Sequence, residues 1–165
     1  MDGRDRDESG KPRNSRPRDA LGRPLPYGAQ GVPRIPDDLS LDPTDSLAYA
    51  QSLLDRGLAF HAHEVLEAAW KNAPASERRL WQSLAQLAVG FTHVQRGNPA
   101  GAANLLRRAA ERLAPYGAAS PHGIDVDGLV WHAHTLLDEL ARGTAVDPER
   151  LRPKLRREIG DQQGP

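Results

Sequence analysis

One predicted helix places a histidine and a carboxylate beside aromatic side chains. His63 and Glu67 are four residues apart, and Phe60 and Trp70 flank them. At about 100° per residue, these four side chains share one face of a helix. Ionisable groups on an aromatic face are paired, hydrogen-bonded or functional, because an unpaired buried charge is costly. The pattern therefore marks a candidate site, although it does not name a reaction.

A second polar stripe lies on the next predicted helix. It contains Gln86 and His93, which are seven residues apart and so share one side of the helix. Helices joined by a short loop pack antiparallel. We therefore expect His63 and Glu67 to face Gln86 and His93 across the interface, as a polar cluster inside an apolar shell.

Three interpretations of this cluster stay open. The first is a structural network that fixes the register of the two helices. The second is a pocket that orients a small molecule or an anion. In the third, His63, Glu67 and His93 bind a divalent metal, since a histidine and a carboxylate one turn apart can chelate one ion. The sequence His-Glu-Val-Leu-Glu at 63–67 lacks the second histidine of the zincin motif, so zincin activity is not predicted.

Helical periodicity, caps and glycine stops supply the elements that must position these residues. Five helices are predicted, at about 45–56, 58–72, 76–96, 98–113 and 126–141, and a short one at about 148–158. No alternating apolar pattern reaches the length of a strand. The predicted fold is therefore all-α, a compact bundle of about five helices in antiparallel hairpins.

The sequence also contains an internal echo at a spacing of 40 residues. Arg56-Gly57 recurs as Arg96-Gly97, and a predicted helix begins directly after each glycine. Small and apolar residues recur in the same register. This layout is typical of stacked helical hairpins, similar to tetratricopeptide-like repeats.

Residues 1–38 form an N-terminal arm of a different composition. The arm holds six prolines, five glycines and fifteen charges, of which eight are basic and seven acidic. Such a segment cannot bury enough apolar area to offset its ordering entropy, so disorder is predicted. RNA or DNA binding through Arg13, Arg16, Arg18 and Arg23 is an alternative that the interspersed acidic residues weaken. The helical domain then covers 43–142, and 143–165 is a tail with the short helix.

Composition limits the function classes further. The chain has 22 basic and 22 acidic residues and no cysteine. Strong attraction to nucleic acid or anionic membrane is therefore not expected of the whole chain, and disulfides and thiolate metal sites are excluded. No stretch approaches 18 consecutive apolar residues, so no membrane span is predicted. Together with the absence of a secretory signal, this predicts a cytoplasmic protein.

Two blocks of sequence resemble the domain-of-unknown-function family 309 (DUF309), which consists of small all-α proteins of bacteria, archaea and plants. The blocks are Phe60-x-x-His63-Glu64-x-x-Glu67-x-x-Trp70 and Gln86-Leu87-Ala88-x(4)-His93-x(3)-Gly97-Asn98-x-x-Gly101-Ala102, and the resemblance covers about residues 45–115. It implies a compact helical-hairpin fold and no established enzyme activity. It also implies that the signature positions are His63, Glu67, Trp70, His93 and Asn98.

Packing roles are expected for several of these positions. Trp70 should anchor the second helix on the third, Asn98 should cap the fourth helix, and Gly101 should allow close helix approach. A homodimer through the fifth helix stays open, because five apolar residues crowd one side of it: Leu129, Val130, Ala133, Leu137 and Leu140. His134 and Asp138, near Trp131, are expected to form a solvated surface pair.

The predicted function is a non-catalytic binding or interaction module, with its ligand between the second and third helices. The ligand is an unknown small molecule or protein, and no cofactor is predicted. The alternative from another class is a metal-dependent hydrolase that uses His63, Glu67 and His93. Nucleic-acid binding through the arm is the second alternative.

Overall fold

The computed structural model describes residues 5–6, 12–13 and 16–157. Its five α-helices are α1 Pro43–Asp55, α2 Ala59–Asn72, α3 Arg78–Gln95, α4 Pro99–Leu113 and α5 Val126–Ala141. Four short 3-10 turns accompany them: η1 Ala75–Glu77, η2 Ala114–Tyr116, η3 Pro121–Gly123 and η4 Pro148–Leu151. Two-residue strands β1 Asp5–Arg6 and β2 Pro12–Arg13 pair antiparallel in the arm. The predicted all-α class is confirmed.

Local sequence signals explain where the helices begin. Asp42 precedes α1 and its carboxylate accepts the Asp45 N–H at 2.7 Å. Asp125 precedes α5 and caps it through the Gly128 N–H at 3.2 Å. Such caps satisfy N–H groups that have no partner inside the helix.

The 40-residue echo corresponds to two copies of one turn. Gly57 and Gly97 have φ angles of 76° and 73°, which favour glycine. After each glycine the next N–H bonds back five residues, from Leu58 to the Leu53 carbonyl at 2.8 Å and from Asn98 to the His93 carbonyl at 2.9 Å. This is the Schellman end of a helix. Both turns reverse the chain and start the second helix of a hairpin.

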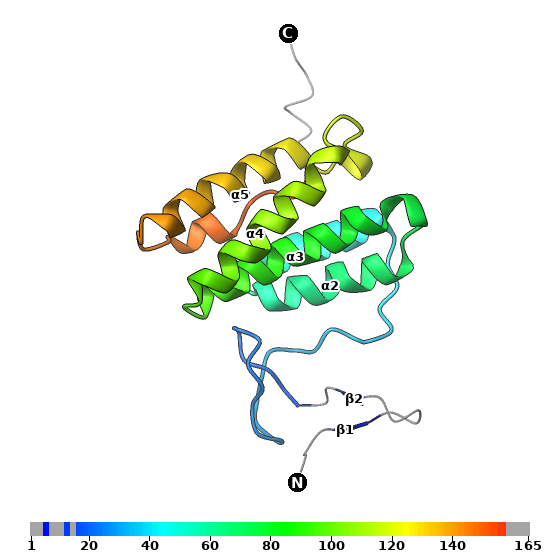
Figure 1. The fold of residues 1–165 in the computed structure, drawn as a ribbon. Coiled ribbons are helices and arrows are strands. Elements are labelled where there is room, and N and C mark those ends of the chain that lie inside the picture. Colours follow the sequence, from blue (N-terminus) through cyan, green and yellow to red (C-terminus); the bar gives the residue numbers. More distant parts are fainter. Residues whose placement is uncertain (1–4, 7–11, 14–15, 158–165) are drawn as a thin grey trace.

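Each helix packs against its neighbour in sequence, α1 on α2, α2 on α3, α3 on α4 and α4 on α5. Figure 1 shows α2, α3, α4 and α5 following one another across the molecule. The core lies between these helices and includes Trp81, which is 1% exposed. Gly90 of α3 allows the close approach of α4, because a Cβ there would lie 3.0 Å from the Leu106 side chain.

The second half of the arm packs on the helical domain, in contrast to the expected disorder of residues 1–38. Ile35 is only 3% exposed and belongs to the core. Arg96, directly after α3, donates from Nε to the Leu21 carbonyl at 2.9 Å. A few specific contacts, apolar and polar, thus place residues 16–38 on the domain, and the average composition of the arm does not reveal them. Most of residues 1–15 lie outside the described residues.

The C-terminal tail also differs from expectation. The helix predicted at 148–158 is limited to η4, because Pro153 has no N–H with which to continue it. The chain then runs extended along the bundle, and Leu155 is 1% exposed. Gln51 of α1 holds it there by accepting the Leu155 N–H at 2.8 Å and donating to the Pro153 carbonyl at 3.1 Å. The tail up to residue 157 is thus part of the domain.

Candidate functional site

The candidate site is centred on one turn of α2. His63 Nε2 lies 3.0 Å from Glu67 Oε2, and His63 Nδ1 lies 3.2 Å from the Phe60 carbonyl oxygen. Both ring nitrogens thus face oxygen acceptors. Two hydrogen bonds form together only when the ring carries two N–H groups, as imidazolium. The helix itself produces this pair, since residues i and i+4 are neighbours on its surface.

Glu67 is held as a carboxylate. The hydrogen bond from His63, opposed by partial burial, is the main reason that the pKa of Glu67 is lowered. Lys71, one turn further on, contributes a contact of 3.5 Å from its Nζ to Glu67 Oε1. A carboxylate with a lowered pKa is a poor proton donor or acceptor near neutral pH.

A cleft of about 190 Å³ opens beside this pair, between α2 and α3. His63, Glu67 and Trp70 line it from α2, and α4 closes it with Leu105. The remaining lining residues come from α3: Gln82, Ala85, Gln86 and Val89. The wall thus combines apolar side chains with one imidazole, one carboxylate and two amides.

Gln86 has an unusual position in this cleft. Its Oε1 atom is buried and finds no hydrogen-bond donor among the described residues. A buried carbonyl oxygen without a donor costs about 1–3 kcal/mol. The structure therefore brings Gln86 close to His63 and Glu67, as expected, yet leaves its acceptor unused by the protein.

His93 does not join them. It is not among the residues that line the cleft, and its Nδ1 lies 3.2 Å from Asn98 Nδ2. The antiparallel register explains this, because Gln95 reaches back to the Gly57 carbonyl at 2.9 Å. Position 93 therefore lies level with the start of α2, about a turn before His63. Four polar groups were expected to converge, and three of them, His63, Glu67 and Gln86, line the cleft.

The metal interpretation loses its third ligand in the same way. Among residues 16–157, no group of three or more histidine and acidic side chains is arranged to hold a metal ion. His63 and Glu67 are hydrogen-bonded to each other. The described contacts thus provide no set of ligands for the hydrolase alternative.

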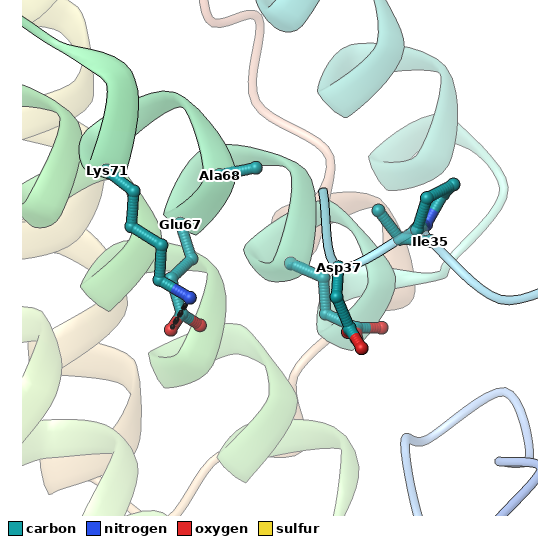
Figure 2. A pocket seen from close by; sticks show the side chains of 7 residues that line it. Ile35, Asp37, Glu67, Ala68 and Lys71 are labelled. Atoms are coloured by element: carbon teal, nitrogen blue, oxygen red, sulfur yellow. Dashed lines mark ion pairs between the residues drawn. The ribbon is translucent and has the colours of Figure 1, made fainter. Parts of the chain in front are cut away.

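A second hollow lies next to the cleft around α2, where the arm crosses the helix, and shares Glu67 with it. It has a volume of about 130 Å³ and combines Asp37 of the arm with Glu64, Glu67 and Lys71. Figure 2 shows Lys71 and Glu67 pointing toward one another, with Asp37 beside the helix. Burial raises the pKa of Glu64, although the nearby His63 and Arg18 oppose this shift. Sequence analysis missed this hollow because residues 35–37 were expected to be disordered.

Phe60 is a point of attachment for the arm. The guanidinium carbons of Arg18 and Arg96 lie 4.8 and 5.6 Å from the centre of its ring. Arg23 pairs with Asp19 at 3.0 Å, and Arg16 lies over the Tyr27 ring. The described arginines proposed to contact nucleic acid therefore all make contacts within the chain, while the Arg13 side chain lies outside the described residues.

The expected packing roles hold for Asn98 but not for Gly101. Asn98 Oδ1 accepts the Gly101 N–H at 3.1 Å and so caps α4. A Cβ at Gly101 would meet the Asn98 side chain first, not another helix. Gly101 therefore makes room for the cap, and the close helix contact belongs to Gly90. Trp70 packs against the core while it lines the cleft.

Comparison with known proteins finds a family model and a relative that each match part of the chain. Residues 47–105 match the model of DUF309, a domain of unknown function. An uncharacterised protein of Bacillus subtilis (strain 168), YpuF, is 36% identical over 86 residues, which are 47% of this chain. The match spans 49% of the relative's length. No solved structure gives a significant match, and none of the described helices has the length and hydropathy of a membrane span.

Proposed function

We propose that this chain, whose residues 47–105 match the model of the domain of unknown function DUF309, is a non-catalytic binding module. The cleft between α2 and α3 receives one planar side chain that carries N–H donors, an arginine of a partner protein above all. A cleft of about 190 Å³ is smaller than the roughly 300–1,000 Å³ of small-molecule sites. It suits a single side chain better than a whole cofactor.

The buried Oε1 of Gln86 carries this proposal. It is a buried acceptor without a donor among the described residues, and its residue lines the cleft together with Glu67 and Trp70. A guanidinium group offers five N–H donors in one plane, binds carboxylates and stacks on aromatic rings. The three chemical features of the cleft thus match one ligand group.

The state of the ionisable groups supports binding rather than catalysis. Glu67 has a lowered pKa and is bonded to His63. A general base works best with a pKa near the operating pH. This carboxylate is better suited to orient a cation than to move a proton.

Nuclear magnetic resonance of the full chain tests the proposal with N-acetyl-arginine amide as the probe. We expect saturable shifts of the Trp70 indole and the Gln86 side-chain amide. Gln86→Met keeps the shape and removes the acceptor, so the affinity for the probe, measured from the Trp70 indole shift, should fall at least several-fold. Gln82→Met, in the same cleft, is the matched control and should bind as the parent chain does.

Two neighbouring probes separate shape from charge. N-acetyl-citrulline amide has the planar shape without the charge, and N-acetyl-lysine amide has the charge without the plane. We expect the affinity to fall from the arginine probe to the citrulline probe and then to the lysine probe. Equal binding by the parent chain and Gln86→Met, or no saturable shift with arginine, would rule the proposal out.

A further inference from the structure

The outer face of α5 carries an exposed indole. Trp131 is 68% exposed, more than the other large apolar side chains exposed in the described chain, Tyr27 and Leu41. A tryptophan buries a large area on contact, and its N–H needs an acceptor once water is removed. Such side chains are enriched at protein interfaces. Trp131 is therefore a candidate anchor for another protein.

A groove lies further along the same helix, toward its C-terminal end. It has a volume of about 490 Å³ and runs between the start of α4 and the end of α5. Ala100, Ala103 and Leu137 provide apolar wall, while Arg107 and Asp138 provide charge. The groove thus offers an apolar slot, an acceptor for an indole N–H and a cation that can stack on an aromatic ring.

Trp131 and the groove belong to one exposed stripe of α5. Its members recur at helical spacing and are all exposed: Asp127, Trp131, His134, Asp138 and Arg142. The stripe carries an acid, Asp127, in the first turn of α5 and a base, Arg142, directly after its last residue, with the acid Asp138 between them. An antiparallel copy of the same helix would present the opposite order of charges.

We propose that a second copy of this chain covers the stripe, with α5 packed antiparallel on α5 about a two-fold axis near residue 134. The axis sets Asp127 against Arg142 of the second copy, since both are equally distant from the centre. It sets Trp131 against Asp138 of the second copy in the same way. In a two-fold interface each contact occurs twice.

The geometry of the helix makes this pairing specific. Trp131 and Asp138 are seven residues apart, or about 10 Å along the axis. One indole therefore reaches the groove of the other copy while its own groove receives the second indole. Antiparallel helices also place opposite ends of their dipoles together.

The interface differs from the dimer expected from sequence. The apolar side of α5 that suggested a dimer includes Leu129 and Ala133, which are 1% and 0% exposed. That side packs inside the molecule, and α4 and α5 are in contact. The surface left for a partner is the charged stripe around Trp131. This proposal uses none of the residues of the α2–α3 cleft and stands independently of it.

Sedimentation of the full chain across the micromolar range tests the proposal. We expect a reversible monomer–dimer equilibrium. Trp131→Ser should weaken it at least about tenfold, as removal of an interface anchor does. Leu41→Ser, which changes another exposed apolar side chain, is the control and should leave the equilibrium unchanged.

Charge reversal provides a sharper test. Asp127→Arg and Arg142→Asp should each weaken the dimer about tenfold, because each sets like charges against one another. The double variant restores opposite charges only across the two-fold axis, so its dimer should approach the parent's. Within one helix the two residues are about 22 Å apart and cannot compensate each other.

Three outcomes would overturn the proposal. One is a chain that stays monomeric across the range, and another is a dimer that Trp131→Ser leaves intact. The third is a double variant, Asp127→Arg with Arg142→Asp, whose dimer is weakened by the sum of the two single effects. Circular dichroism of each variant confirms that α5 keeps its helical content, and Trp131→Ser removes only an exposed side chain.

Discussion

His63 and Glu67 form a hydrogen-bonded pair within one turn of α2, with His63 Nε2 and Glu67 Oε2 3.0 Å apart. The side chains of His63 and Glu67 are 20% and 36% exposed. The pair is therefore neither a buried network nor a free surface contact. It positions a carboxylate at the mouth of a cleft that a second helix completes.

Removal of this pair should have a small effect on stability. Because both side chains remain partly solvated, His63→Ala and Glu67→Ala should each lower the free energy of unfolding by about 0.5 kcal/mol. Urea denaturation at pH 7 measures this, and the double variant gives the coupling of the pair. A loss of several kcal/mol would show instead that the pair is a structural element of the core.

Gln86→Met should raise the free energy of unfolding by about 1 kcal/mol. The substitution removes a buried carbonyl oxygen that has no donor among the described residues, and it keeps the side-chain volume. Thermal and urea unfolding of this variant and of Gln82→Met measure the difference. Equal or lower stability for Gln86→Met would show that the oxygen is already satisfied in the folded chain.

Acidification below about pH 6.5 should destabilise the fold. Burial lowers the pKa of His61 and of His132 below the ordinary value of 6.5. His132 Nε2 lies 2.6 Å from the Arg150 carbonyl, and the Arg150 guanidinium faces its other nitrogen. The unfolded chain takes up protons in this range more readily than the folded one. Stability is therefore complete above about pH 6.5 and falls below it.

Two variants test the origin of this pH dependence by urea unfolding at a series of pH values. His132→Gln should make the fall shallower, because one of the two groups is lost. Glu64 has a raised pKa, so above its ordinary value of about 4.5 the folded chain takes up this proton more readily than the unfolded chain does. Its protonation therefore opposes the loss of stability that the histidines cause. Glu64→Gln should therefore make the fall steeper. An unchanged profile in both variants would contradict the assignment.

Asn98→Ala should lower the free energy of unfolding by about 1 kcal/mol, because the Gly101 N–H loses its acceptor. Asn98→Asp keeps an acceptor at a helix start, where negative charge is favourable. It should retain most of the stability. Comparison of the two by thermal unfolding isolates the acceptor of the cap, because both variants lack the Asn98 Nδ2 group that faces His93.

Gly22→Ala should release the second half of the arm from the domain. Gly22 has a φ of 78°, and a Cβ there would collide with the Phe60 ring. Gly28→Ala is the matched control, because Gly28 has a φ of 85° and nothing within 4 Å of such a Cβ. Tryptic cleavage after Arg18 should accelerate in the first variant only. Equal rates would show that Phe60 does not hold the arm.

Much of the architecture was predictable from local signals. The caps at Asn98 and Asp125, and the stops at Gly57 and Gly97, define helix ends through bonds between residues close in sequence. The His63–Glu67 pair is local in the same sense, since one helical turn creates it. These features depend on the chain within about five residues, which is why periodicity and spacing indicate them.

Tertiary structure decided which side chains from distant segments lie beside these local features. The register of α3 against α2 placed Gln86 beside Glu67 and turned His93 toward Asn98, and no spacing within either helix specifies that register. The attachment of Ile35 and Leu155 depends on apolar hollows formed by distant helices. Sequence by itself thus determined the helices, their ends and the pair on α2. Only packing between segments far apart in the chain determined the cleft, the buried arm and the exposed face of Trp131, because those free energies arise from contacts that local patterns do not encode.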